Sequence, residues 1–568
     1  MVASLYKKII SGRPYWYLRE MGWVDGRPKM ISERYVGTAA EVEALLDARE
    51  QAMMPERTRH LDFGAVAAAW GLAEELGVAA IIDEHAGPVR GLPLSPGTYL
   101  ALAAVNRVVD PCSKRGFAEW WRTTAADRFT KIAASALDHR RFWDGFHAVA
   151  LEAVEVIEEK VALAACARFG VDTSSVALDM TNFASFIDTG NQKAPVAQRG
   201  KAKQKRTDLR LVGLGLVVTR DGAIPLLSRA YPGNKPDVTQ FPEMIKTLSA
   251  RHTALAAAAG QQHTEMTVVF DAGQNSRANF ELLAGTGLHY VGSVPASDCR
   301  DLLALPAKAR TLVDEDRFGK LTAHDGRRVV YGAERRTILT HSPQLHAHQV
   351  RGFEGTTLAK ATRQLDELAA TLARGKTRRA RATVEAEITK ITRDPWARRV
   401  VTWQLHGEKP TDLRLAWSVD ADARAALEEE IFGKHVLITD HDDWPAAEVI
   451  AGYRSQSEAE FSFRQMKDPH AVSFSPMFHW TEHNIRIHVL TCVIALQIAH
   501  LMRLRARRAG LHMSVRELLD QLAAIGETVL IYPSAGGRPK ARRMLTETTT
   551  THDKLIEIFQ LDRYAPRP

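Results

Sequence analysis

The chain has 568 residues, more than a single hydrophobic core organises, which predicts three or four domains. Its hydrophobic fraction of 45% and its charged fraction of 25% are ordinary for a folded globular protein. A formal net charge of +8 permits a polyanionic partner but does not require one, because nucleic-acid binding depends on local basic patches.

Cysteine content and apolar runs exclude further classes of protein. None of the four cysteines has a C-x-x-C spacing, which argues against a zinc site or a disulfide framework and predicts a cytoplasmic protein. The first residues lack the apolar segment of a signal peptide. The longest apolar run, 488–502, is interrupted by Gln497 and His500 and is too short to span a bilayer. We therefore expect a buried helix there and no association with a membrane.

The N-terminal part divides into two predicted regions. In residues 1–55, aromatic and basic residues alternate around turn signals, which predicts a small β-rich module with Tyr15, Trp16 and Tyr17 on one strand. These aromatics need do no more than pack the small sheet. Residues 56–168 have a helical, alanine-rich pattern in which the pair Asp110-Pro111 ends one helix before another begins.

Residues 169–296 have a mixed α/β pattern. Three strands are predicted between 172 and 232, followed by a helix at 238–252. A strand at 265–271, a helix after Asn275 and a strand at 287–295 complete the order. Three strands, a helix, a strand, a helix and a strand is the order of a ribonuclease H-like core.

That core is interrupted and then resumes. Residues 297–432 combine short predicted strands with a charged helical stretch, and a loop of this length would itself have to fold, so we predict a β-rich insertion subdomain. The core resumes over 433–505, with a strand at 435–440 and a helix from Pro445 to about Asp468. Residues 506–568 are predicted to be a helical C-terminal region. The fold class is therefore α/β, with helical regions at both ends.

Three acidic residues have the placement that a two-metal phosphoryl-transfer site needs. Asp179 and Asp271 end apolar runs of strand type, and Glu460 lies in the middle of a helix. Such carboxylates can hold two Mg²⁺ ions about 3.5–4 Å apart, and Mn²⁺ should substitute. Each acid also has a simpler interpretation. Asp271 can accept backbone hydrogen bonds in its turn, Asp179 would be costly to bury unless paired, and Glu460 alone would be an ordinary surface residue.

Helical spacing connects Glu460 to its neighbours. Tyr453, Glu460 and Lys467 are seven residues apart, which is two helical turns, so all three project from nearly one face. Gln456 joins this face, whereas Glu458 points to nearly the opposite side. A stripe of this composition suits a bound DNA strand, with the carboxylate on metal and the lysine on phosphate.

These residues resemble the signature of bacterial insertion-sequence DDE transposases of the cut-and-paste group, Y-(2)-R-(3)-E-(6)-K. Gln456 stands where the family has arginine, and Arg454 or Arg464 is a candidate to supply that charge. The resemblance extends over about 60–505 and assigns DNA binding to the helical region 56–168. It implies catalysis by Asp179, Asp271 and Glu460, DNA contacts from the stripe, a hairpin intermediate, and an assembly of at least two copies on the element ends. The alternatives are a ribonuclease H-like nuclease that does not transpose and an inactive DNA-binding protein.

A basic run follows the first predicted core strand. It has two interpretations, a solvated loop or a clamp on DNA phosphates whose affinity would fall with salt. Its candidate DNA-binding residues are Lys201, Lys203 and Lys205, with Arg199, Arg206 and Arg210 beside them.

Overall fold

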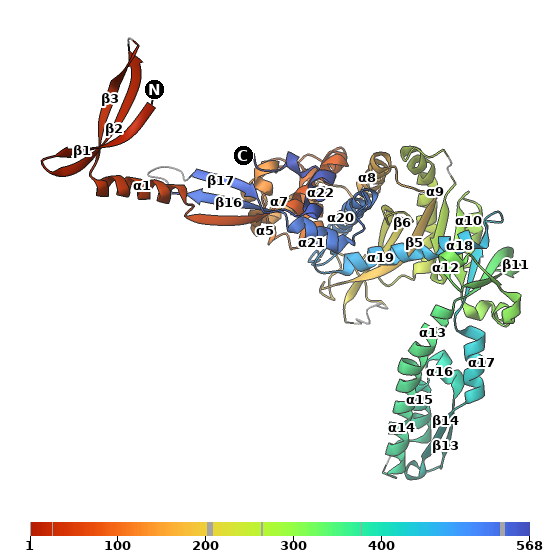
Figure 1. Ribbon diagram of the computed structural model, residues 1–568. Helices are drawn as coiled ribbons and strands as arrows, with labels where there is room; N and C mark the ends of the chain where they lie inside the picture. The colour runs from red at the N-terminus through yellow and green to blue at the C-terminus, as the bar shows by residue number, and fades with distance from the viewer. Residues whose placement is uncertain are drawn as a thin grey trace. The chain divides into compact units, whose positions relative to one another are not determined.

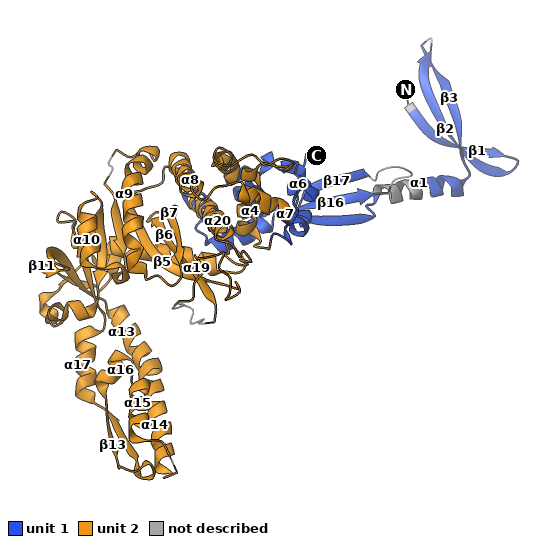
Figure 2. Ribbon diagram, turned by 180° about the vertical axis from the view of Figure 1, so that it is seen from behind, with its two compact units in different colours: residues 1–71, 114–139, 505–568 blue, residues 72–113, 140–504 orange. Residues whose placement is uncertain are grey.

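Figure 1 shows a computed structural model of the chain, which has two compact units. Figure 2 colours the first unit, residues 1–71, 114–139 and 505–568, apart from the second, residues 72–113 and 140–504. The predicted phosphate-binding lysines 201, 203 and 205 lie outside the described residues. The structure describes residues 2–24, 26–200, 208–262, 265–376, 378–533 and 540–567.

The first unit begins with a three-stranded antiparallel sheet, β1 (Val2–Ile10), β2 (Arg13–Val24) and β3 (Arg27–Gly37), followed by α1 (Ala39–Met53). Aromatic rings pack across it as the sequence predicts. The ring of Tyr17 on β2 lies 5.9 Å from that of Tyr6 and 5.4 Å from that of Tyr35.

A second sheet in this unit corrects the helical prediction for residues 506–568. β16 (Gly526–Tyr532) lies between β17 (Lys540–Leu545) and β4 (Arg57–Asp62), and both pairings are antiparallel. Glu527 of β16 is buried and is paired with Arg128 and Arg543, each at 2.6 Å. Strand β16 could not be identified from its neighbours alone, because one of its partners lies more than four hundred residues earlier in the chain. The helices of this part include α2 (Gly64–Glu75), α5 (Phe117–Thr123), α6 (Ala126–Thr130), α21 (Val515–Ala523) and α22 (Thr550–Ile558).

The second unit is organised by a nine-stranded mixed sheet with the order β10-β11-β12-β15-β9-β8-β5-β6-β7. β5, β8 and β9 run parallel to one another, whereas β6, β7 and β15 pair antiparallel with their neighbours. The predicted alternation of strands and helices over 169–296 is present. The elements in that stretch are β5 (Ser175–Ser185), β6 (Arg210–Thr219), β7 (Pro225–Pro232), α9 (Phe241–Ala258), β8 (Thr267–Phe270), α10 (Arg277–Ala284) and β9 (His289–Val294).

The second unit also contains several helices outside the sheet. α4 (Pro96–Val109) begins at Ser95, whose hydroxyl accepts the amide of Thr98, and ends before the predicted break at Asp110. α20 (Glu482–Arg508) is long and apolar enough to cross a membrane by length and composition, but 94% of its apolar window is buried inside the protein. Its polar residue Gln497 donates to the carbonyl of Pro225, which explains how the predicted buried helix tolerates it. The other helices here are α3 (Val78–Asp83), α7 (His139–His147) and α8 (Ala153–Phe169).

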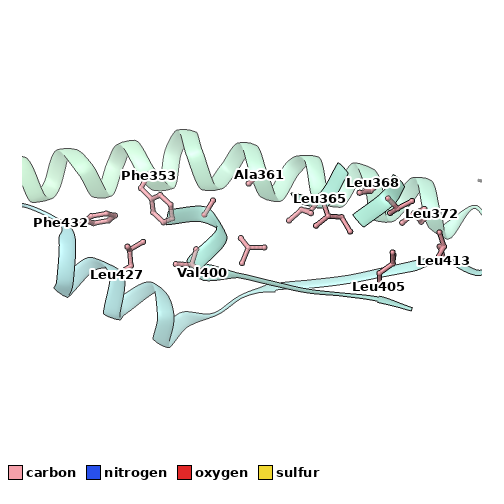
Figure 3. Packing of buried hydrophobic residues seen from close by; sticks show 14 residues of the cluster. Phe353, Ala361, Leu365, Leu368, Leu372, Val400, Leu405, Leu413, Leu427 and Phe432 are labelled. Carbon is pink, nitrogen blue, oxygen red and sulfur yellow. The ribbon is translucent and has the colours of Figure 1, made fainter. Parts of the chain in front are cut away.

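The insertion is smaller than predicted and mainly helical rather than β-rich. Strands from the predicted insertion belong to the large sheet, and two of them are joined by a tight turn at Tyr331 and Gly332, whose φ values are 49° and 84°. The residues from Pro343 to Phe432 build a core of their own, with Phe353, Leu427 and Phe432 at one end (Figure 3). The elements are β10 (Thr311–Leu312), α12 (Glu315–Phe318), β11 (Thr322–Val330), β12 (Ala333–His341), α13 (Pro343–Gly352), α14 (Ala359–Ala373), α15 (Arg381–Ile391), α16 (Pro395–Val400), β13 (Val401–His406), β14 (Arg414–Val419), α17 (Ala421–Ile431) and β15 (Lys434–Thr439).

Candidate active site at the ends of the central strands

The two predicted catalytic aspartates start from neighbouring positions on adjacent strands. β5 and β8 are parallel, with Leu178 opposite Phe270, so the next residues, Asp179 and Asp271, come side by side at the same edge. Asp179 is half-buried and Asp271 is exposed. The sequence predicts both acids at strand ends, which is wrong for Asp179, because β5 continues to Ser185; Asp271 does directly follow the end of β8. Only the pairing of the two strands brings the acids together.

Both aspartates also accept backbone hydrogen bonds. Asp179 Oδ1 accepts the amide of Met180 at 2.7 Å, and Asp271 Oδ1 accepts the amide of Ala272 at 2.6 Å. Ser293 Oγ of β9 donates to the same Asp271 oxygen at 3.1 Å. These bonds orient the carboxylates, so the simpler interpretation of Asp271 as a turn residue holds alongside any chemical role.

The helix that carries Glu460 is divided. α18 (Ala446–Arg454) and α19 (Gln456–Lys467) replace the single helix predicted over this stretch, with Ser455 between them. The Ser455 hydroxyl donates to the carbonyl of Gly452 at 2.6 Å, a local bond that competes with the helical pattern. Tyr453 therefore belongs to the first helix and Glu460 to the second.

The predicted stripe nevertheless faces the central strands. Gln456 Nε2 donates to the carbonyl of Leu178 at 3.1 Å, and Lys467 Nζ donates to Thr181 Oγ1 at 2.8 Å. α19 thus lies along β5, with Glu460 between these two contacts. Gln456 is 7% exposed and uses its amide on the strand, so its proposed contact with DNA stays a prediction.

The pKa of Tyr453 indicates that the three acids lie near its phenol. Burial raises the pKa of its phenol to about 12, a hydrogen bond with Ser293 opposes the rise, and the charges of Asp271, Glu460 and Asp179 add to it. The charges of all three carboxylates therefore act on this one hydroxyl, which stays protonated at neutral pH. A protonated phenol among three acids can donate a hydrogen bond to a phosphate oxygen.

Two neighbouring charged residues are engaged elsewhere. Glu458 lies 3.7 Å from Arg503 of α20, which agrees with its predicted position off the stripe. The guanidinium of Arg454 lies 4.6 Å from the centre of the Phe318 ring, so it packs on an aromatic face. Arg464 is exposed on α19.

The carboxylate oxygens suit a hard, oxygen-seeking cation such as Mg²⁺. The three acids are not among the groups of His, Cys, Asp and Glu in the described residues whose ligand atoms all lie within 4.8 Å of one another. At least two of the three acids therefore have their ligand atoms more than 4.8 Å apart.

A tighter polar cluster, which the sequence did not indicate, occurs at the other end of the strands. His289 begins β9, and Asp440 and His441 directly follow β15; their ligand atoms lie within 4.8 Å. The two imidazole rings are stacked at 4.5 Å, and His441 Nε2 lies 2.8 Å from Thr267 Oγ1. The nitrogen lone pairs of an imidazole lie in the plane of its ring, so the lone pairs of two stacked rings do not converge on one ion. Hydrogen bonding therefore explains this cluster better than metal binding does.

No protein-family model matches this chain, and no curated protein matches it. Among solved structures, it is similar to a piggyBac transposase in a synaptic complex with hairpin DNA. The TM-score is 0.39 and the sequence identity 7%, over 83% of this chain and 82% of the other. A TM-score of this size does not establish a common fold.

Proposed function

We propose that the protein is a DNA transposase of an insertion sequence, of the DDE class, which cuts DNA at element ends and joins those ends to target DNA. The observation that carries the proposal is the pairing of β5 with β8, which places Asp179 and Asp271 side by side, while α19 with its Glu460 lies along β5. The strand order β7-β6-β5-β8-β9, antiparallel up to β5 and parallel beyond it, supports a ribonuclease H-like core.

The three acids would hold two Mg²⁺ ions. When bound, such ions activate a nucleophile and neutralise charge on the attacked phosphate and its leaving oxygen. The chain's own groups hold the DNA in place. Lys467, fixed against Thr181, would bind a phosphate, and the Tyr453 hydroxyl would donate to a phosphate oxygen near the acids.

The chemistry proposed for this site is two transfers at phosphorus. Water first adds to a phosphodiester and the P–O3′ bond breaks, which leaves a 5′-phosphate and a free 3′-hydroxyl. That hydroxyl then attacks the opposite strand, exchanging one P–O bond for another and closing a hairpin, which is reopened before joining. Because two element ends must be cut together, we expect at least a dimer on DNA.

A direct test incubates the protein with Mg²⁺ and DNA that carries the inverted repeats flanking its gene. Nicked, hairpin and joined products in sequence are expected. Nicked products alone, without repeats beside the gene, would favour a nuclease of the same fold. Binding to the end DNA with no product in Mg²⁺ or Mn²⁺ would favour an inactive DNA-binding protein.

A further inference from the structure

An apolar pocket of about 630 Å³ lies between residues 186–193 and 477–480. Its walls carry three aromatic side chains that are largely open to solvent. Phe186 and Phe478 are each 69% exposed, and Trp480 is 55% exposed. Exposing this much aromatic surface in one hollow is unfavourable in water and marks a binding site.

Hydrogen bonds hold the walls of the pocket in place. Asn191 Nδ2 donates to the carbonyl of Trp480 at 2.7 Å, and the amide of Glu482 donates to the carbonyl of Lys193 at 2.7 Å. Arg210 donates to the carbonyl of Asn191 at 2.7 Å from the neighbouring strand β6. The pocket is therefore formed without an occupant, while its ring faces remain accessible.

The two charged side chains at the pocket, those of Lys193 and Asp188, are not equally able to contact a ligand. Lys193 Nζ lies 4.9 Å from the centre of the Trp480 ring, at the wall of the pocket. The carboxylate of Asp188 accepts the amide of Gly190 at 2.7 Å and so takes part in its own turn. Aromatic faces beside one amine match a nucleotide, whose base can stack while its phosphate meets the amine.

The pocket continues the two elements that carry the acids. β5 runs from Asp179 past Thr181 and Phe183, and Phe186 directly follows its end. Beyond α19 the chain returns to β5, where Phe474 stacks on Phe183 at 4.2 Å, before it forms the second wall. At about 3.3 Å per strand residue, roughly 23 Å separates Asp179 from Phe186, a span of a few nucleotides.

We infer that this pocket binds an unpaired nucleotide of the DNA strand that leaves the acidic site, by stacking its base on Phe186, Phe478 and Trp480. Lys467 lies between the acids and the pocket and would bind an intervening phosphate, and Lys193 would bind the phosphate beside the stacked base. Stacking on these faces is indifferent to base identity. The inference rests on the proposed function in so far as that function makes DNA the partner.

Fluorescence anisotropy without divalent ions tests binding apart from cleavage. The probes are a blunt DNA duplex and the same duplex with single-stranded thymidine tails that carry 2-aminopurine at successive positions. We expect tighter binding of tailed DNA and quenching at one or two tail positions. In full-length Phe186→Ala/Trp480→Ala, the preference for the tail should fall about ten-fold and the quenching should disappear.

Trp23→Ala is the matched control, because Trp23 on β2 is an exposed tryptophan of the other unit. It should keep the quenching. Unchanged tail preference in the pocket variant would overturn the inference while leaving Mg²⁺-dependent cleavage, and hence the proposed function, intact. Absence of Mg²⁺-dependent cleavage by the wild-type protein, together with a tail preference that the pocket variant loses, would contradict the proposed function and leave the inference standing. A change of oligomeric state instead of DNA preference would assign the pocket to a second copy of the chain.

Discussion

The two ends of the central strands use polar residues in opposite ways. Where β9 begins, the Asp440 carboxylate accepts the amide of Tyr290 at 2.8 Å and lies 3.2 Å from Nδ1 of His289, so it has two polar partners. Where β8 ends, the charges of Asp271 and of two further carboxylates all act on the phenol of Tyr453. Grouping like charges raises the free energy of the folded protein unless a cation binds. The difference separates a structural cluster from a candidate catalytic one.

The largest expected effect comes from removing one carboxylate of the site. Asp179→Asn, Asp271→Asn and Glu460→Gln should each lower the cleavage rate by about 10³-fold or more, because several kcal/mol of charge stabilisation is lost. DNA affinity should change little. Product formation in Mg²⁺ and in Mn²⁺ measures this effect, and Asp440→Asn at the other end is the control. Cleavage that survives in any of the three variants would remove that residue from the catalytic set.

Thermal stability should also distinguish Asp271→Asn from Asp440→Asn. The variant that loses activity should keep its stability, and the variant that keeps activity should lose stability. Without metal, Asp271→Asn should raise the melting temperature slightly by relieving repulsion, whereas Asp440→Asn should lower it, because weakened hydrogen bonding costs roughly 1 kcal/mol of stability. Thermal unfolding in EDTA measures both changes. Equal destabilisation by the two variants would mean that the acids are satisfied structural groups. The two ends of the strands would then not differ in how they use carboxylates.

Substitutions in the stripe on α18 and α19 should affect hairpin formation and joining more than the first nick. Tyr453→Ala and Lys467→Ala should lower hairpin and joining yields about ten-fold, with a smaller loss of initial nicking, because these groups hold the strand rather than the metal. Single-turnover assays resolve the steps. Glu458→Ala is the control, since Glu458 faces Arg503. Wild-type hairpin yields in both stripe variants would reduce the stripe to a structural face.

The basic run offers a test of its phosphate clamp. Replacing Lys201, Lys203 and Lys205 by alanine should flatten the dependence of log affinity on log salt by about three. Titrations at several salt concentrations measure the slope, which should be unchanged if the run is a solvated loop.

Acid pH should weaken the structural end of the strands. Burial lowers the pKa of His441 below its ordinary value, so the unfolded chain binds a proton there more readily than the folded protein. This contribution to stability is complete above the unfolded pKa, about 6.5, and is lost as pH falls toward the folded pKa. His441→Gln should therefore show a shallower loss of stability between pH 7 and pH 5 in chemical unfolding.

Local sequence patterns were sufficient for elements whose partners are close in the chain or whose apolar runs are continuous. The alternation of strands and helices around Asp179 and Asp271 is as predicted, and so is the burial of α20. The predictions from local patterns were wrong where the pairing of distant segments decides the secondary structure. β16 was predicted as part of a helical tail because its partner β4 is distant in the sequence, and three strands of the predicted insertion belong instead to the large sheet.

By itself, the sequence determined which residue types stand on the strands and on the helical stripe, because strand and helix periods are local properties of the backbone. It also determined the spacing that relates Tyr453, Glu460 and Lys467. The tertiary structure alone decided that β5 and β8 are parallel neighbours in register, and that α19 lies along β5. Only those contacts gather the three carboxylates around one phenol, because convergence requires chain segments more than two hundred residues apart to pack together.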